Sequence, residues 1–333
     1  MNLKEVLRGI SHNSTFLEKL WIILQWNKTK LLALQFTDVE YAQKLFKRKY
    51  GHELNLDDPE SFDEKMWFLK LSNRDPLLTQ CSDKHAVREY IVARGYGNIL
   101  KTEFACFKNA DEIDFDCLPS PCYLKCNHAS GMNLVYAKER NLHVEHIRWK
   151  FNYLLKQQPY YLSREWNYKN IPPRIVCEEV LSSNNGHGIF PELQFFCFHG
   201  EALFLIYNLG LADEKGYHSD PTRWALWPDW SLVEEAKAMN HNVHTPGQPE
   251  NYVDMLRCAE DLSKPFPFVR VDLFSIDGRM VFNELTFYSG GGFTLSKTKI
   301  IQDLCGKKIN LDGYAISDDA TKRRTWAEVK RGQ

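Results

Sequence analysis

The 333-residue chain lacks an excess of charge, a long apolar run and any pattern of a disulfide or zinc framework. It has 42 Lys and Arg residues against 43 Asp and Glu residues, so its net charge is −1. No overall positive field is therefore available to hold nucleic acid, and we expect no nucleic-acid partner. The N-terminal stretch MNLKEVLRGISHN also lacks the charged and then apolar layout of a signal peptide, so we expect a cytoplasmic protein.

The most apolar segment, residues 16–36, has too few apolar residues in a row to cross a membrane. Its longest uncharged run extends only from Leu20 to Asn27, whereas a spanning helix needs roughly 20 apolar residues. We expect an amphipathic helix that packs on the domain. The alternative is a peripheral membrane contact helped by the cations of this segment, which are Lys19, Lys28 and Lys30.

Nine cysteines are present, but they are scattered and odd in number. Cys122 and Cys126 lie close together in one expected strand, and no second pair completes a zinc site of the usual spacing. We therefore expect reduced and mostly buried thiols. The common nucleotide and nucleophile signatures G-x-x-x-x-G-K-[ST], G-x-G-x-x-G and G-x-S-x-G are also absent. Any phosphate site must be built in another way.

The first 75 residues have the pattern of helices, and the rest of the chain changes to short strands between helices. The expected N-terminal helices are Thr15–Leu34, Val39–Tyr50 and Ser61–Leu71, and Ser61 with Glu64 has the pattern of a capping box. The next expected helix runs from Ser82 to Ala93. The later expected elements are the strands Cys122–Asn127, Arg174–Leu181, Leu193–Phe198, Ala202–Tyr207, Phe268–Phe274 and Met280–Phe287, and the helices Val144–Gln157, Ser231–Met239 and Tyr252–Leu262. Because most strands are joined by tight turns, the expected class is α+β with mainly antiparallel sheets.

The stretch 267–287 is expected to form a β-hairpin around an Asp-Gly turn. The length of the loop decides which side chains share a face of this hairpin. A two-residue turn would put Glu284 on the face opposite to Asp272. We predict a three-residue loop, 276–278, in which Arg270 lies opposite Glu284, because this register separates the polar from the apolar side chains.

One face of the predicted hairpin collects the polar residues Arg270, Asp272, Glu284 and Thr286. Two converging carboxylates suit Mg²⁺, which takes one or two carboxylates and completes its shell with phosphate and water. The alternative is an Arg270–Glu284 cross-strand ion pair without a further role.

The segment 122–131 is expected to be a strand that runs into a loop of small residues. Lys125 lies inside the strand, where a lysine is either an edge-strand charge or a phosphate ligand that points into a cleft. Ser130 and Gly131 can bring backbone amides close to a phosphate, because small residues allow close approach. His128 is either a general base or, the more common case, a hydrogen-bonded structural residue.

Taken in order, these pieces resemble the ATP-grasp superfamily, and in detail its TupA-like branch, which is associated with teichuronopeptide and capsular polysaccharide synthesis. The resemblance rests on an Asp-Lys helix start, a strand lysine before a small-residue loop, a Glu-Glu strand end and an R-x-D hairpin that closes in E-x-[N/T]. The matching stretches, within about residues 40–313, are 59–70, 82–90, 124–131, 196–200, 268–272 and 283–287. The implied fold is an ATP-grasp fold, two α+β subdomains with mainly antiparallel sheets that clasp ATP, preceded by a helical N-terminal region.

The resemblance also implies ligands for the cofactors ATP and Mg²⁺. The implied ATP-binding residues are Lys84, Lys125, Ser130, Gly131, Glu178, Val180, Leu181 and Glu192. Within this set the lysines and the 130–131 loop would meet the phosphates, Glu178 the adenine amino group, and Glu192 the ribose. The implied metal ligands are Asp272, Glu284 and Thr286, and the implied catalytic residues are Arg270 and Lys125.

The implied organisation is a helical region (1–75), an ATP-grasp domain (76–315, with subdomains 76–180 and 181–315) and a C-terminal tail (316–333). The implied reaction joins a carboxylate to an amine with ATP through an acyl phosphate. A uronic-acid sugar, free or nucleotide-linked, would be the carboxylate and an amino acid or small amine its partner, in surface polysaccharide biosynthesis.

Two other functions stay open. Asp114-Phe115-Asp116 is a D-x-D string that would suit a metal-dependent glycosyltransferase. A non-catalytic nucleotide-binding protein would keep the same candidate ligands. The aromatic and polar segment that contains residues 217–220 and Trp224 is either an acceptor-binding lid or an ordinary surface loop.

Overall fold

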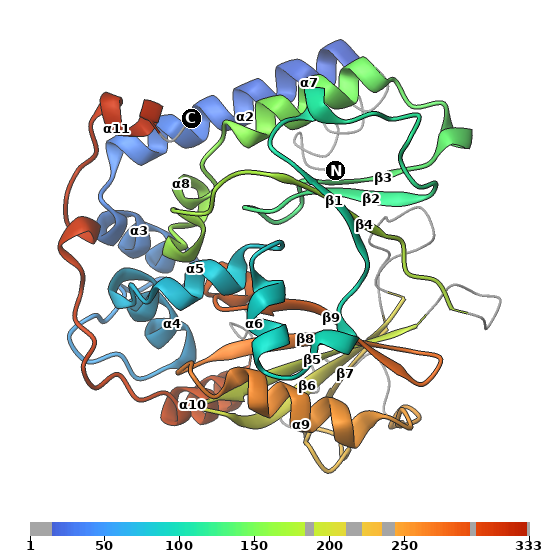
Figure 1. Cartoon of the computed structure of the whole chain (residues 1–333). Coiled ribbons are helices and arrows are strands. Elements are labelled where there is room, and N and C mark those ends of the chain that lie inside the picture. The colour runs from blue at the N-terminus through green and yellow to red at the C-terminus, as the bar shows by residue number, and fades with distance from the viewer. Residues whose placement is uncertain (1–14, 184–189, 211–221, 235–243, 294–297, 332–333) are drawn as a thin grey trace.

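The computed structural model describes residues 15–183, 190–210, 222–234, 244–293 and 298–331. Two antiparallel sheets form the centre of the molecule, and helices lie around them (Figure 1). In the part of the chain that is described, no helix combines the length and the apolar content needed to cross a membrane.

The described chain begins with the helices α2 (Thr15–Gln35), α3 (Asp38–Tyr50) and α4 (Phe62–Ser72). They confirm the helices expected in this part of the sequence. The capping box is also present, because the Ser61 side chain accepts a hydrogen bond from the Glu64 amide and the Glu64 carboxylate accepts one from the Ser61 amide. Two short helices from later in the chain, α8 (Tyr160–Ser163) and α11 (Trp326–Arg331), pack against α2.

The first sheet has four strands in the order β1-β4-β2-β3, which are Glu103–Phe107, Ile175–Glu179, Cys122–Cys126 and Asn133–Tyr136. Every neighbouring pair is antiparallel. Phe151 of α7 (Val144–Leu155) shares an apolar core with Leu124 on one face of this sheet. Since side chains alternate along a strand, Tyr123 and Lys125 point to the other face, where both line a cavity.

The second sheet has five strands in the order β7-β6-β5-β8-β9, which are Thr222–Leu226, Glu201–Leu209, Pro191–Phe198, Val269–Ile276 and Arg279–Thr286. All its neighbouring strands are antiparallel as well, which confirms the predicted class. The helices that share its core are α4, α5 (Pro76–Ser82), α6 (Val87–Ala93), α9 (Tyr252–Ser263) and α10 (Lys299–Lys308).

The helix expected from Ser82 to Ala93 is wrong in its start, because the structure has two helices there. The first one, α5, begins after Asp75, whose carboxylate accepts a hydrogen bond from the amide two residues on, and a proline takes the first helical position. The chain then turns at Asp83, whose carboxylate accepts a hydrogen bond from the His85 amide at 2.8 Å. Lys84 therefore lies in the turn between two helices and not inside one.

The sequence pattern does not predict the short strands β1, β3 and β7. The helix expected at Ser231–Met239 does not start at Ser231, since Leu232 forms a β-bridge with Leu226. Its remainder, 235–239, and the segment 217–220 lie outside the described residues.

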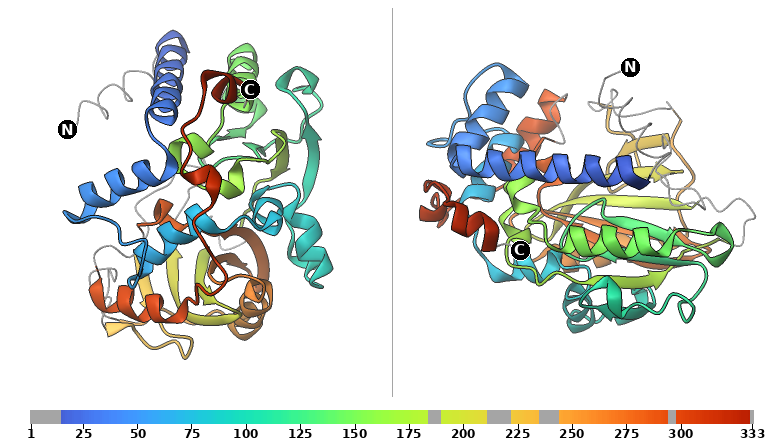
Figure 2. Two further views of the ribbon diagram at one scale, coloured as in Figure 1. Left: turned by 90° about the vertical axis from the view of Figure 1, so that its left-hand side faces the viewer. Right: turned by 90° about the horizontal axis from the view of Figure 1, so that it is seen from above.

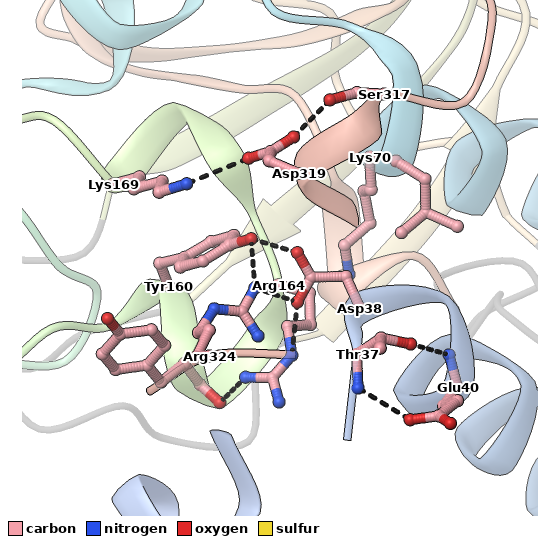
Figure 3. Close-up of polar contacts among 12 residues, drawn as sticks. Thr37, Asp38, Glu40, Lys70, Tyr160, Arg164, Lys169, Ser317, Asp319 and Arg324 are labelled. Carbon is pink, nitrogen blue, oxygen red and sulfur yellow. Dashed lines mark hydrogen bonds and ion pairs between the residues drawn. The ribbon is translucent and has the colours of Figure 1, made fainter. Parts of the chain in front are cut away.

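Distant parts of the chain meet in a buried ion cluster around Asp38 of α3 (Figure 3). The Asp38 Oδ1 atom lies 2.9 Å from Nε of Arg164 and 2.5 Å from Nη2 of Arg324, and the Tyr160 hydroxyl donates to Asp38 Oδ2. Asp38, Arg164 and Tyr160 are each 1% exposed. The cluster joins the N-terminal helices to α8 and to the segment before α11.

Candidate active site

A cavity of about 1390 Å³ lies between the two sheets. Its walls come from β2 and β4 on one side and from β5, β8 and β9 on the other. All the residues predicted for the site except Thr286 line it, and these are Lys84, Lys125, Ser130, Gly131, Glu178, Val180, Leu181, Glu192, Arg270, Asp272 and Glu284. Thr286 is connected to these residues through its hydroxyl, which donates a hydrogen bond to Glu284 Oε1 at 2.8 Å.

The β8–β9 hairpin closes with a two-residue turn and not with the predicted three-residue loop. The turn residues, Asp277 and Gly278, have φ values of 50° and 77°, the left-handed conformation that Asp-Gly favours in tight hairpins. The predicted pairing of Arg270 with Glu284 is therefore wrong, and Arg270 lies opposite Thr286.

A β-bulge further along the hairpin brings the two carboxylates together. Leu273 lies opposite Phe282, but the next pair is Asp272 opposite Glu284, so that Asn283 is the extra residue of the bulge. The bulge shifts the register by one residue. Asp272 and Glu284 therefore lie on the same face, whereas the two-residue turn without the bulge would place them on opposite faces.

Arg270 makes the largest number of contacts on this face. Its Nε and Nη2 atoms donate to Oδ1 and Oδ2 of Asp272 at 2.7 and 2.5 Å, and its Nη1 atom donates to Ser289 Oγ at 2.7 Å. Its Nη2 atom also lies 3.3 Å from Glu284 Oε1 and 3.2 Å from Thr286 Oγ1. Burial alone would lower the pKa of Arg270, but Asp272 and Glu284 raise this pKa above its ordinary value. The guanidinium is therefore charged and holds the two carboxylates in place.

The donor set on this face fits one hard divalent cation. Asp272 and Glu284 lie opposite each other, and the Glu284 side chain is 46% exposed in the wall of the cavity. Two carboxylates and a hydroxyl suit Mg²⁺, because phosphate oxygens and water complete its shell. The described residues contain no cluster of three or more His, Cys, Asp or Glu that could hold a metal ion.

Glu178 of β4 lies between two lysines in the opposite wall. Its Oε2 atom is 2.6 Å from Nζ of Lys125 and 3.5 Å from Nζ of Lys101. Burial alone would raise the pKa of Glu178, but the two lysines outweigh burial and lower this pKa to about 2. Burial, reinforced by the charge of Lys125, lowers the pKa of Lys101 to about 8. This wall carries more positive than negative charge, which suits a phosphate chain.

The small-residue loop after β2 is held by Lys84. The Lys84 Nζ atom donates to the Ala129 carbonyl at 2.5 Å, and the Lys84 amide donates to the Asn127 carbonyl at 3.3 Å. These bonds hold the loop where Ser130 and Gly131 line the cavity. Gly131 has a φ of 74°, a left-handed conformation that favours glycine. The loop is placed where its small residues allow an anion to approach the backbone closely.

The far end of the cavity is lined by Val180 and Leu181, which follow β4, and by Glu192 of β5. Glu192 is 1% exposed, and its carboxylate accepts hydrogen bonds from Asn283 Nδ2 at 2.7 Å and from Gln194 Nε2 at 2.9 Å. Burial raises the pKa of Glu192 above its usual value. This end therefore combines an apolar hinge with a fixed hydrogen-bond acceptor, which suits a nucleoside.

A family model described as TupA-like ATPgrasp matches residues 64–310 of the chain. The chain belongs to the TupA-like ATP-grasp family. It has the predicted ATP-grasp fold and is an ATP-grasp ligase, an enzyme that forms a carbon–nitrogen bond and converts ATP to ADP. A comparison with the curated proteins gives no match.

Several solved structures are similar to this ATP-grasp protein. A D-alanine–D-alanine ligase from Bacillus anthracis has 16% identity and a TM-score of 0.38, over 80% of this chain and 72% of that ligase. A D-alanine–D-alanine ligase from Helicobacter pylori has 13% identity and a TM-score of 0.38, over 75% and 70% of the two chains. The ATP-grasp ligase PsnB in complex with Mg and ADP has 10% identity and a TM-score of 0.37, over 70% of this chain and 58% of PsnB.

The predicted set lacks several polar residues that line the ATP-grasp cavity, among them Lys101 and Asn283. The Lys101 Nζ atom lies 3.3 Å from Asn283 Oδ1, and both residues line the cavity. Asn283 carries a signal in the sequence, since it is the polar exception among the apolar positions of the hairpin. Lys101 carries none, because it lies in a connection before β1 that has no regular pattern.

Asp114, Asp116 and His128, which were considered for other roles, do not line the described cavity. Asp114 and Asp116 are exposed in a turn, where Asp114 Oδ1 accepts a hydrogen bond from the Asp116 amide. His128 is 2% exposed, and burial, with Lys84 nearby, lowers its pKa to about 4. His128 is therefore buried away from the cavity, which does not fit the role of a general base. All nine cysteines are free, and only Cys117 is exposed, as expected for reduced and mostly buried thiols.

Proposed function

We propose that this ATP-grasp protein is a carboxylate–amine ligase that works through an acyl phosphate. The observation that carries the proposal is the cavity between the sheets. One wall of the cavity carries Lys84 and Lys125. The facing wall carries Arg270, Asp272 and Glu284. Cations for a phosphate chain and a carboxylate pair for Mg²⁺ therefore share one cavity.

In this proposal the nucleotide extends along the cavity from the hinge to the hairpin. Adenine lies against Val180 and Leu181 with Glu178 at its amino group, and Glu192 accepts the ribose hydroxyls. The phosphates lie between Lys125 and the hairpin, under the small-residue loop. The observations that support this placement are the fixed orientation of Glu192 at the nucleoside end and the position of Lys125 in the wall of the cavity.

The first chemical step brings two anions together, so the task of the protein is positioning and charge neutralisation. The substrate carboxylate attacks the γ-phosphorus, the bond to the bridging oxygen breaks, and ADP leaves. Lys125 and Arg270 neutralise charge on the transferring group. Mg²⁺ held by Asp272, Glu284 and Thr286 would supply further neutralisation of the phosphates. The amine then attacks the acyl carbon, phosphate leaves with the electron pair, and loss of the amine proton gives the amide.

The proposed carboxylate substrate is a uronic-acid-type sugar or its nucleotide-linked precursor, and the proposed amine is an amino acid or a small amine. The support is membership of the TupA-like family, for which we infer a role in surface polysaccharide biosynthesis. The cavity volume of about 1390 Å³ also exceeds the roughly 300–1,000 Å³ of a pocket for one drug-sized ligand. Space for a second substrate beside the nucleotide is consistent with a ligase.

We also propose the domain boundaries expected from the sequence, with a helical region 1–75, subdomains 76–180 and 181–315, and a tail 316–333. The support is that the strands of the first sheet all precede residue 180 and those of the second sheet all follow it.

The test is a crossed screen of uronic acids and their nucleotides against amines, read as release of ADP and phosphate. The proposal expects release only when a carboxylate and an amine are both present, and loss of release in Asp272→Asn. Asp114→Asn with Asp116→Asn is the matched control and retains turnover. Release of UDP from a nucleotide sugar without ADP would contradict the proposal and favour the glycosyltransferase.

A further inference from the structure

Helix α2 carries apolar side chains on two sides, and the described part of the chain covers only one of them. The covered side carries Ile22, Trp26, Thr29 and Ala33. Ile22 and Trp26 pack on the core of the first sheet, and Ala33 belongs to the cluster that α8 and α11 complete. A helix that is apolar all round is normally buried on all sides, whereas α2 lies along the outside of the molecule (Figure 2).

The uncovered side carries five large apolar side chains. Their exposed fractions are Phe16 71%, Leu17 38%, Leu20 45%, Leu24 55% and Leu31 59%. With 3.6 residues per turn these five positions fall within an arc of roughly 120°. They form an apolar strip along the helix that only the exposed Asn27 interrupts, between Leu24 and Leu31, and this differs from the single exposed apolar residues that any protein surface has.

The charges around this strip are positive. On the helical wheel Lys28 lies at one border of the strip and Lys30 at the other, and Lys28 is exposed. The one acidic residue of α2, Glu18, turns away from the strip, because its carboxylate lies 2.7 Å from His146 Nε2 and 2.7 Å from Lys150 Nζ. No carboxylate of the helix therefore offsets the two lysines on the uncovered side.

We propose that the strip from Phe16 to Leu31 docks on an anionic lipid bilayer. The leucines would enter the boundary between headgroups and acyl chains, and Lys28 and Lys30 would reach the anionic headgroups. An apolar face with cations at its borders is the pattern of a helix that lies in the plane of a membrane surface. A second copy of the chain fits less well, because two such strips would bring lysines of like charge together. The proposal does not depend on the proposed function.

The test measures co-sedimentation of the full-length protein with vesicles of phosphatidylcholine, with and without phosphatidylglycerol. We expect binding to the anionic vesicles that weakens as salt is added. The triple variant Leu20→Ser, Leu24→Ser, Leu31→Ser loses about tenfold or more in affinity, and Lys28→Gln and Lys30→Gln each lose about fivefold. The matched control is Val92→Ser with Val253→Ser, which removes exposed side chains of α6 and α9 and leaves vesicle binding unchanged.

The melting temperature and the ATP turnover of each variant, measured without vesicles, show whether the fold is kept. Wild-type protein that does not bind anionic vesicles overturns the proposal, and so does a folded triple variant that binds them as well as the wild type. A dimer in solution that the triple variant converts to a monomer also overturns it, since a second copy would then cover the strip.

Discussion

Arg270 and Asp272 lie two residues apart on β8 and are joined by two parallel hydrogen bonds, Nε to Oδ1 at 2.7 Å and Nη2 to Oδ2 at 2.5 Å. Alternate residues of a strand point to the same face, so the R-x-D sequence itself places the pair side by side. The contact joins the cation proposed for the transferring phosphate to a carboxylate proposed for Mg²⁺. The two roles are therefore coupled, and a change in one side chain displaces the other.

Replacing Arg270 by Lys keeps the charge but removes the fork that holds Asp272. We expect the turnover number for ADP release to fall about a hundredfold, because an ammonium group cannot make the paired contacts or keep the phosphate aligned. Arg279→Lys, an exposed position on the same hairpin, is the matched control and retains wild-type turnover. An Arg270→Lys enzyme that is folded and within twofold of the wild type would contradict the assigned role.

Replacing Lys101 by Met removes the link between Glu178 of β4 and Asn283 of β9. We expect the KM for ATP to rise about tenfold with a smaller change in kcat, because the lysine orients groups at the nucleoside end rather than at the transferring phosphate. Lys101→Arg restores part of the affinity, and the exposed Lys108→Met leaves the KM unchanged. A loss in kcat of that size with no change in KM would instead show that Lys101 stabilises the transition state.

The hairpin shows what the sequence can and cannot predict about this site. Separation of polar from apolar side chains correctly predicts that Asp272 and Glu284 share a face, because burial of one face of a hairpin demands it. The same argument predicts the wrong turn. A bulge at Asn283 shifts the register by one residue, as a longer loop would. Alternation of polar and apolar residues cannot distinguish the two. The contacts of Lys101 cannot be predicted from the sequence, because Lys101 precedes β1 of the first sheet and contacts Asn283 of the second sheet.

The ion cluster of Asp38 with Arg164 and Arg324 gives a prediction about stability. Asp38→Asn keeps the size of the side chain but leaves two buried guanidinium groups without their carboxylate, so we expect a loss of about 3–5 kcal/mol in the free energy of unfolding. The Lys47–Glu53 pair is exposed, and Glu53→Gln is expected to cost less than about 1 kcal/mol. Urea denaturation of both variants measures the difference. Equal losses in the two variants would show that the cluster adds no more than a surface pair.

The buried His128 predicts a dependence of stability on pH. Burial and Lys84 lower its pKa in the folded protein to about 4, from an ordinary value of 6.5. Between these two pH values the unfolded chain binds a proton that the folded protein does not, so stability falls as pH falls through this window. The loss from this group reaches roughly 3 kcal/mol at the acid end and is absent above pH 6.5.

Urea denaturation of the wild type and of His128→Asn across this range isolates the contribution of His128 from that of the carboxylates. The difference in unfolding free energy between the two proteins is expected to shrink as pH falls from 6.5 toward 4. Parallel curves over the whole range would contradict a depressed pKa for His128.

The most direct test of the proposed chemistry follows one oxygen atom. The carboxylate substrate found in the crossed screen is labelled with ¹⁸O and incubated with the enzyme, ATP, Mg²⁺ and the amine, and the released phosphate is analysed by mass spectrometry. Transfer of γ-phosphate to the carboxylate predicts one ¹⁸O in each phosphate, because the acyl–oxygen bond breaks when the amine attacks. Phosphate without label, released together with ADP and amide, would contradict the acyl phosphate and with it the proposed function.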